Sequence, residues 1–272
     1  MSPPAQWTDM FPGPCLGFAT LCLVVTVIAA QLPAIKVLEW EKRLFVSLCC
    51  GALVNCSIVS WPALSALYEM YQMPGFHSDC SASGLKIVNL QAPSIAVLAC
   101  GLTCGFFLQD SLIMALYPKE TAKELGGAAA YKIMWMHHVV SLFVWPYAMV
   151  SSVSSVFVVY FMATEITNIG QNTFLLANRG GFWFKKYDLP IGICWMVSFL
   201  IFRVLPVPFV VYWWLVTHVI SPSGCWVGVS WAEFFVSFTT IPIPLMLNLF
   251  WFYKIVKKAS RMIFGKSKPK DL

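Results

Sequence analysis

Charged side chains are scarce in this chain of 272 residues, since Asp, Glu, Lys and Arg make up only 11% of it. Soluble globular domains carry about 25% charged residues, so an ordinary water-soluble protein is excluded. Histidine is scarce too, with four residues, which are too few for the histidine-rich di-iron sites of membrane desaturases and hydroxylases. The sequence also lacks the internal repeat that builds the two halves of many secondary transporters, so a transporter is the least favoured class.

Apolar residues make up 59% of the chain and gather in long runs. A helix needs about 20 apolar residues to cross the hydrocarbon core of a bilayer. The sequence therefore predicts an all-α polytopic membrane protein with seven transmembrane helices. The predicted spans are 14–35, 44–68, 93–117, 134–152, 154–176, 189–217 and 231–254.

Positive charge alternates between the two sides of these spans. Sixteen of the eighteen Lys and Arg residues fall in the loops after spans one, three and five and in the tail, the exceptions being Lys86 and Arg203. The positive-inside rule then predicts a lumenal N-terminus and a cytosolic C-terminus. Because the basic residues are divided among membrane-bounded loops, we expect no nucleic-acid partner. The basic tail is expected to meet anionic lipid.

Ten cysteines are present, and most of them lie inside predicted spans, where a free thiol packs as a small apolar group. Cys80 and Cys225 fall instead in two non-cytosolic loops, where oxidation is allowed. A Cys80–Cys225 disulfide is the hypothesis for this pair, and two free thiols are the alternative.

Ionisable side chains inside a membrane usually face a bundle interior or a wet cavity, and they mark functional sites. At about 1.5 Å per helical residue, those of predicted spans three to six fall in the cytosolic half of the bilayer. We therefore predict one shared cavity that opens to the cytosol. The side chains are Asp110, His137, His138, Glu165, Thr167, Asn168 and Arg203. His218 and Glu233 lie near the opposite boundary and are interpreted as interfacial.

His137 and His138 are adjacent, so their side chains point about 100° apart on a helix. One imidazole is expected to line the cavity while the other contacts a neighbouring helix, with Asp110 or Glu165 orienting the ring. Two metal ligands on one helix face need i, i+4 spacing, which this pair lacks. We predict no metal site.

Structural interpretations of the same residues stay open. The histidine pair could lie at the headgroup boundary, and Arg203 could serve only as the counter-ion of a buried carboxylate. Thr167 and Asn168 could join helices through hydrogen bonds. Nothing in the sequence decides between these roles and a functional one.

The polar residues occur in an order that resembles the TLC-domain family, which includes ceramide synthases, translocating-chain-associating proteins and smaller lipid-related membrane proteins. The matching stretches are GFFLQD at 105–110, the histidine pair at 137–138, EITN at 165–168 and Phe202-Arg203. The likeness implies a six-helix TLC domain at 43–255. It would follow an N-terminal segment 1–42 with the first helix and precede a basic cytosolic tail, 256–272.

Ceramide synthases transfer an acyl chain from acyl-CoA to a sphingoid amine, and their histidine pair is essential. The resemblance implies an acyl-CoA-dependent acyltransferase with membrane lipids as partners, acyl-CoA as co-substrate and no bound cofactor. His137 or His138 would be the base or nucleophile, with Asp110 and Glu165 orienting it. The candidate substrate-binding residues are Arg203, Asn168 and Thr167, and Arg203 would balance charge or hold a phosphate or carboxylate.

One departure weakens the transfer of that activity. Ceramide synthases carry a His-Asp pair and further aspartates on the next span, whereas this chain has a single carboxylate there, Glu165. The pattern is closer to the smaller TLC proteins. A non-catalytic lipid-binding regulator, or a receptor that escorts cargo between endoplasmic reticulum and Golgi, is therefore the alternative function.

The chain ends in KPKDL, which places Lys268 and Lys270 at the fifth and third positions from the C-terminus. This spacing resembles a cytosolic dilysine signal, which coat proteins recognise and which predicts retrieval from the Golgi to the endoplasmic reticulum membrane. An ordinary basic tail that follows the positive-inside rule is the alternative. A homo-oligomer is left open.

Overall fold

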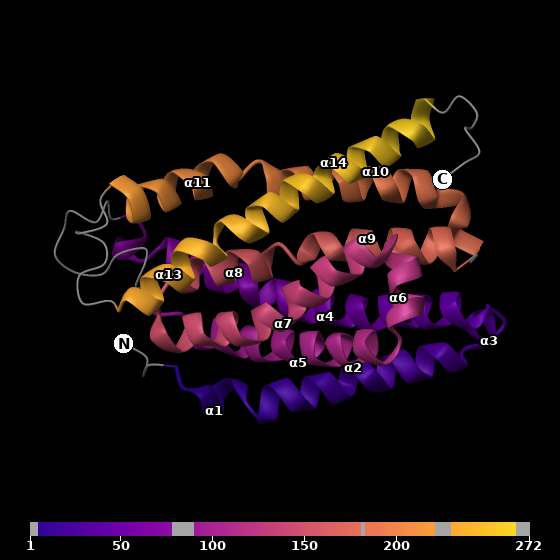
Figure 1. Ribbon diagram of the computed structural model, residues 1–272, viewed down its shortest axis with the longest axis horizontal. Helices are drawn as coiled ribbons and strands as arrows, with labels where there is room; N and C mark the ends of the chain where they lie inside the picture. Colours follow the sequence, from indigo (N-terminus) through magenta and orange to yellow (C-terminus); the bar gives the residue numbers. More distant parts are fainter. Residues whose placement is uncertain (1–4, 78–89, 181–182, 221–229, 265–272) are drawn as a thin grey trace.

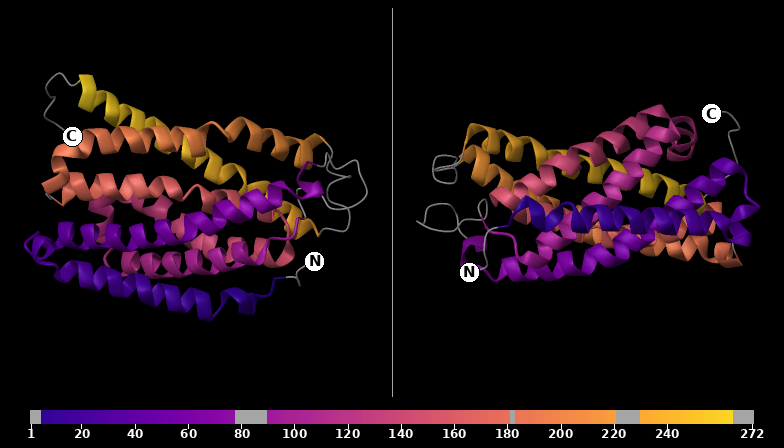
Figure 2. Two further views of the ribbon diagram at one scale, coloured as in Figure 1. Left: turned by 180° about the vertical axis from the view of Figure 1, so that it is seen from behind. Right: turned by 90° about the horizontal axis from the view of Figure 1, so that it is seen from below.

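The computed structural model describes residues 5–77, 90–180, 183–220 and 230–264, and within these ranges the chain is helical and contains no strand. The long helices run along the long axis of the molecule, and the short helix α6 runs across it (Figures 1 and 2). They are α1 (Trp7–Met10), α2 (Gly13–Gln31), α3 (Pro33–Lys36), α4 (Trp40–Tyr71), η1 (Pro74–His77), α5 (Ser94–Leu116), α6 (Pro118–Leu125), α7 (Ala128–Ser151), α8 (Ser155–Ala163), α9 (Ile166–Arg179), η3 (Trp183–Tyr187), α10 (Asp188–Phe199), η4 (Leu200–Val204), α11 (Val207–Leu215), η5 (Val216–Ile220), α13 (Trp231–Thr240) and α14 (Pro242–Phe264).

Six helical runs within the described residues are long and apolar enough to cross a membrane. The prediction of an all-helical, multi-pass membrane protein is confirmed. The predicted fifth span, 154–176, is occupied by α8 and α9, of 9 and 14 residues. Neither is long enough alone, because the helix is interrupted between them. α1 and the last turn of α14 lie at opposite ends of the long axis (Figure 1).

Small residues allow α2 and α5 to pack closely, as is common between helices in membranes. A Cβ atom built on Gly105 would lie 2.3 Å from the carbonyl oxygen of Cys15 and 2.9 Å from the amide nitrogen of Ala19. One turn earlier on α5, a Cβ on Gly101 would lie 3.1 Å from the Cα of Met10 in α1, just before α2. The two backbones therefore approach each other as only glycine permits.

The Gly105→Ala variant is expected to lose stability, because the added methyl group must push α2 away from α5. Overpacking of this kind costs roughly 1–3 kcal/mol, so thermal denaturation in detergent is expected to occur several degrees lower. The matched control is Gly17→Ala, since a Cβ at Gly17 meets no atom within 4 Å. Equal melting temperatures for the two variants would contradict this packing.

The short helix α6 lies at the same end of the bundle as α3 (Figure 1). Gly126 and Gly127, with φ of 93° and 115°, form the turn from α6 into α7, a backbone conformation that favours glycine. Lys123 of α6 donates to Glu41 of α4, and this hydrogen bond raises the pKa of Lys123 above its ordinary value. The contact attaches α6 to the bundle.

At the other end of the bundle, a buried polar cluster joins η5, α13 and the α7–α8 connection. Nε2 of His218 lies 3.0 Å from Oγ of Ser237, whose hydroxyl also contacts that of Ser154. Only 4% of His218 is exposed. The rings of Trp214, Phe234 and Phe238 surround the imidazole, and its position near the membrane boundary stays a prediction. Glu233, the other residue interpreted as interfacial, caps α13 through Ser230.

The predicted Cys80–Cys225 pair lies outside the described residues, so the disulfide stays a prediction. The eight described cysteines are free, and most of them are buried among apolar side chains. This agrees with their interpretation as small packing residues.

Candidate functional site

The helix break between α8 and α9 falls at Thr164 and Glu165, where the sequence contains neither proline nor glycine. The Thr164 hydroxyl donates to the carbonyl of Phe161 at 2.7 Å, and the Thr167 hydroxyl donates to the carbonyl of Thr164 at 2.9 Å. Threonine hydroxyls compete in this way with the regular backbone pattern. At the break the Asn168 N–H donates to the Glu165 carbonyl, so the Thr164 carbonyl accepts from the Thr167 N–H and lacks its regular donor four residues later.

A second irregularity lies opposite this break, where η4 is a π-helical segment that carries Arg203. Pro206 lies two residues after the segment, and because proline has no N–H, it cannot donate to the Phe202 carbonyl one turn earlier. The Tyr160 hydroxyl of α8 donates to that carbonyl instead, at 3.0 Å. π-Helical segments are rare and often occur at functional sites.

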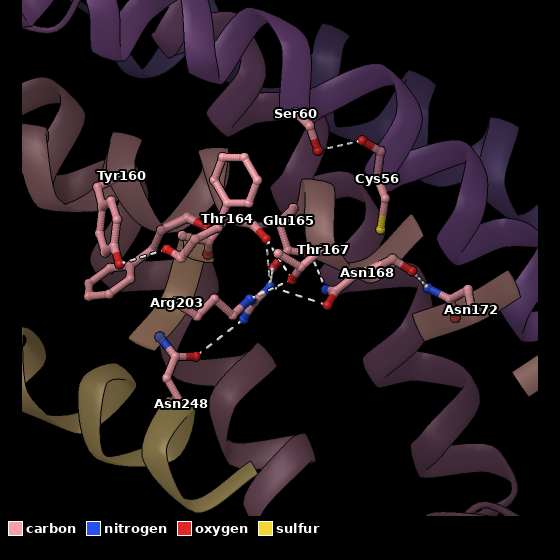
Figure 3. A network of polar contacts seen from close by, with 12 residues as sticks. Cys56, Ser60, Tyr160, Thr164, Glu165, Thr167, Asn168, Asn172, Arg203 and Asn248 are labelled. Carbon is pink, nitrogen blue, oxygen red and sulfur yellow. Dashed lines mark hydrogen bonds and ion pairs between the residues drawn. The ribbon is translucent and has the colours of Figure 1, made fainter. Parts of the chain in front are cut away.

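Arg203 binds the broken helix (Figure 3). Its side chain is 13% exposed and that of Glu165 is 11% exposed, with 3.2 Å between Nη2 and Oε1. Nε donates to the Thr167 hydroxyl at 2.8 Å, and Nη2 also donates to the Thr164 carbonyl at 3.0 Å and to Oδ1 of Asn168 at 3.2 Å. Asn168 in turn donates to Oε2 of Glu165 at 2.7 Å.

This arrangement has one partner that the sequence analysis missed. Nη1 of Arg203 donates to Oδ1 of Asn248 on α14 at 3.3 Å. Asn248 is a polar residue in the middle of an apolar run, so the criterion used for Asn168 would have found it. All three nitrogen atoms of the Arg203 guanidinium thus donate to protein oxygens, a geometry that favours the counter-ion interpretation of Arg203.

The histidine pair lies on α7 and faces α5. Nδ1 of His138 is 3.1 Å from Oδ2 of Asp110, and the two side chains are 7% and 16% exposed. The geometry is that of an ion pair when His138 is protonated and not of a regular hydrogen bond. Of the two predicted orienting acids, Asp110 lies beside the pair, whereas Glu165 is engaged by Arg203.

Aromatic rings hold the two imidazoles. Phe107 stacks on His138 with ring centroids 4.7 Å apart, and its edge meets His137 at 5.7 Å. Trp145, two turns along α7, also contacts the His137 ring. His138 is buried while His137 is half-buried, so the two rings differ in exposure, as adjacent helix positions imply.

The Arg203–Glu165 network and the histidine pair both border one partly open cavity of about 500 Å³. The helices that enclose it are α4, α5, α6, α7, α8, α9, α10 and α14. Most of its wall is apolar. The predicted site residues that line it are Asp110, His137, His138, Glu165, Asn168 and Arg203. Thr167 is buried behind this wall and reaches it through Arg203.

The end of the cavity near α6 is lined by Thr121 and Glu124. Glu124 is paired with Arg179 of α9, with 2.5 Å between Oε2 and Nη1. Among the described residues, no three His, Cys, Asp or Glu side chains are grouped as metal ligands would be.

The fold and the site define the class of the protein. It is an all-helical membrane bundle with a cavity whose wall carries paired acids and bases. The family model of the TLC domain matches residues 45–257, and the chain belongs to this family. The comparisons with curated proteins and with solved structures gave no match. Membership links the chain to lipid metabolism.

Proposed function

We propose that the cavity binds a membrane lipid and that the protein acts on the sphingolipid or glycerophospholipid composition of the endoplasmic reticulum membrane. One observation carries the proposal, namely an apolar space of about 500 Å³ with ionisable side chains in its wall. Ligand pockets typically enclose roughly 300–1,000 Å³ and combine an apolar wall with a few polar groups. A lipid matches this combination, because its acyl chain suits the apolar wall and its polar head suits the ionisable side chains.

The sharper form of the proposal is acyl transfer from acyl-CoA. His137 or His138 takes the proton of an acceptor amine or hydroxyl as the acceptor atom attacks the thioester carbonyl carbon. The C–S bond then breaks, and the imidazole returns the proton to the leaving thiolate of CoA. Asp110 would orient His138 and stabilise its protonated form during the transfer. His137, which is more exposed, would face the lipid.

A filled cavity should no longer hold lipid. Ala52 of α4 lines the cavity, and Ala52→Phe adds a ring where a lipid chain would lie. We expect the purified full-length chain to carry bound lipid in native mass spectrometry and Ala52→Phe to lose most of it. The control is Leu112→Phe, since Leu112 is 55% exposed on the outer face of α5. Equal lipid in both variants would refute the proposal.

A second candidate is a non-catalytic lipid-binding regulator or cargo receptor, and it is favoured because every nitrogen of the Arg203 guanidinium donates to a protein oxygen. In that case the Arg203–Glu165 network only shapes the cavity. The bound lipid would then be the same before and after incubation with acyl-CoA and acceptor lipids, whereas an acyltransferase would convert it.

We further propose that α8 and α9 together form a seventh crossing, with a lumenal N-terminus and a cytosolic C-terminus. The opposite positions of α1 and the end of α14 support an odd number of crossings (Figure 1). A glycosylation acceptor inserted after Gly75 should be modified and one inserted at Gly126 should not, and the reverse would refute this orientation. The proposed retrieval signal at Lys268 and Lys270 lies outside the described residues.

A further inference from the structure

Two side chains that line the cavity, those of Trp195 and Lys254, carry nitrogen donors without an acceptor of their own among the described residues. Nε1 of Trp195 on α10 is shielded from solvent, and it has no hydrogen-bond partner in the part of the chain that the structure describes. The ammonium of Lys254 on α14 lies over the rings of Phe250 and Trp251, 4.6 and 5.2 Å from their centroids. No described carboxylate forms an ion pair with Lys254.

The two donors lie at a similar depth. α10 and α14 pack together and run in opposite directions (Figure 1), with the Arg203–Asn248 hydrogen bond joining η4, which directly follows α10, to α14. Trp195 precedes Arg203 by eight residues, and Lys254 follows Asn248 by six. At about 1.5 Å per residue, both donors lie roughly 9–12 Å from that bond, toward the end of the bundle that carries α6.

The remaining charge in the cavity wall is matched. Each carboxylate there faces a basic side chain, in the pairs Asp110 and His138, Glu165 and Arg203, and Glu124 and Arg179. Lys254 therefore leaves a positive charge without a counter-ion, at about the depth of the shielded Trp195 N–H. This combination suits a ligand group that is both anionic and rich in acceptor oxygens, because charge-assisted hydrogen bonds to such groups are the strong ones.

We propose that Trp195 and Lys254 bind the phosphate group of a lipid whose chain occupies the cavity. This inference rests on the proposed lipid-binding function and specifies its ligand as a phosphate-bearing amphiphile. The phosphate could belong to a phospholipid or to the CoA portion of an acyl-CoA. In either case the indole N–H donates to a phosphate oxygen, and the ammonium neutralises its charge.

The test is competition for the full-length chain in detergent, with a pyrene-labelled diacylglycerol as the bound probe. Dioleoyl-phosphatidic acid is expected to displace the probe at about tenfold lower concentration than dioleoylglycerol, since a hydrogen bond to a charged group is worth more than one to a neutral group. Oleoyl-CoA, compared with phosphatidic acid, identifies the source of the phosphate. Oleate tests whether a carboxylate serves equally well.

Lys254→Gln and Trp195→Phe are each expected to reduce the preference for phosphatidic acid over dioleoylglycerol at least threefold. The matched control is Lys257→Gln, because the Lys257 ammonium lies over Tyr253 and does not line the cavity. Three results would overturn the phosphate site. The preference for phosphatidic acid survives in both variants, it falls equally in the control, or oleate displaces the probe as well as phosphatidic acid does. If no lipid displaces the probe, or the probe itself does not bind, the proposed function fails instead.

Discussion

The Arg203→Met variant is expected to be poorly folded, with the largest loss of stability of any single change in the cavity wall. Methionine removes five hydrogen bonds and leaves Glu165 as an uncompensated charge in a nearly buried position. Removing one partner of a buried ion pair typically costs about 3–5 kcal/mol. The measurement is the fraction of monodisperse protein after heating, followed by size-exclusion chromatography.

The double variant Arg203→Met/Glu165→Met separates this explanation from simple overpacking. When both charges are removed, no charge stays buried, and replacing a whole buried pair by apolar residues is often close to neutral. We therefore expect the double variant to recover most of the lost stability. The control Arg261→Met removes an exposed arginine of α14 and should behave as wild type. A double variant no more stable than Arg203→Met would contradict the ion-pair account.

The second large effect concerns the histidine pair. The double variant His137→Ala/His138→Ala is expected to reduce acyl transfer from radiolabelled acyl-CoA to background, with lysophospholipid and sphingoid amine as acceptors. General acid–base catalysis typically contributes about 10²–10⁴-fold, and both candidate bases are absent from this variant. Product formation equal to that of wild type would remove the catalytic interpretation while leaving lipid binding intact.

Asp110→Asn provides a graded version of the same experiment. The asparagine keeps the size of the side chain beside His138 but loses the charge that stabilises a protonated ring. We expect kcat to fall by about 10²-fold with KM nearly unchanged, because Asp110 acts on the imidazole and not on bound lipid. The control Asp188→Asn changes the carboxylate at the start of α10, whose described contact is Asn178 at 3.5 Å.

The membrane class and most polar positions could be predicted because they depend on composition along the chain. An Asp or Arg inside an apolar run is visible without coordinates, and so is a pair of adjacent histidines. Which acid pairs with which base was not predictable. Glu165 faces Arg203 across a helix break and a π-helical segment, which no apolar periodicity records. Asp110 faces His138 because α5 packs against α7.

The interruption at Thr164 and Glu165 escaped prediction for a related reason. Glycine and proline are the usual sequence signals of a break, and here threonine hydroxyls take that role. The aromatic wall at Phe107 and Trp145 escaped as well, because aromatic residues make up 15% of the chain and most of them only face lipid or pack. Their proximity to the histidines is a property of the assembled bundle.

Photo-cross-linking in native membranes is the most direct test of the lipid-filled cavity. A lipid with a diazirine in its acyl chain should label residues that line the cavity, such as Ala52, Cys56 and Met134, as well as the outer surface. Labelling confined to outward-facing residues such as Leu112 and Phe143, which are 55% and 70% exposed, would contradict the account.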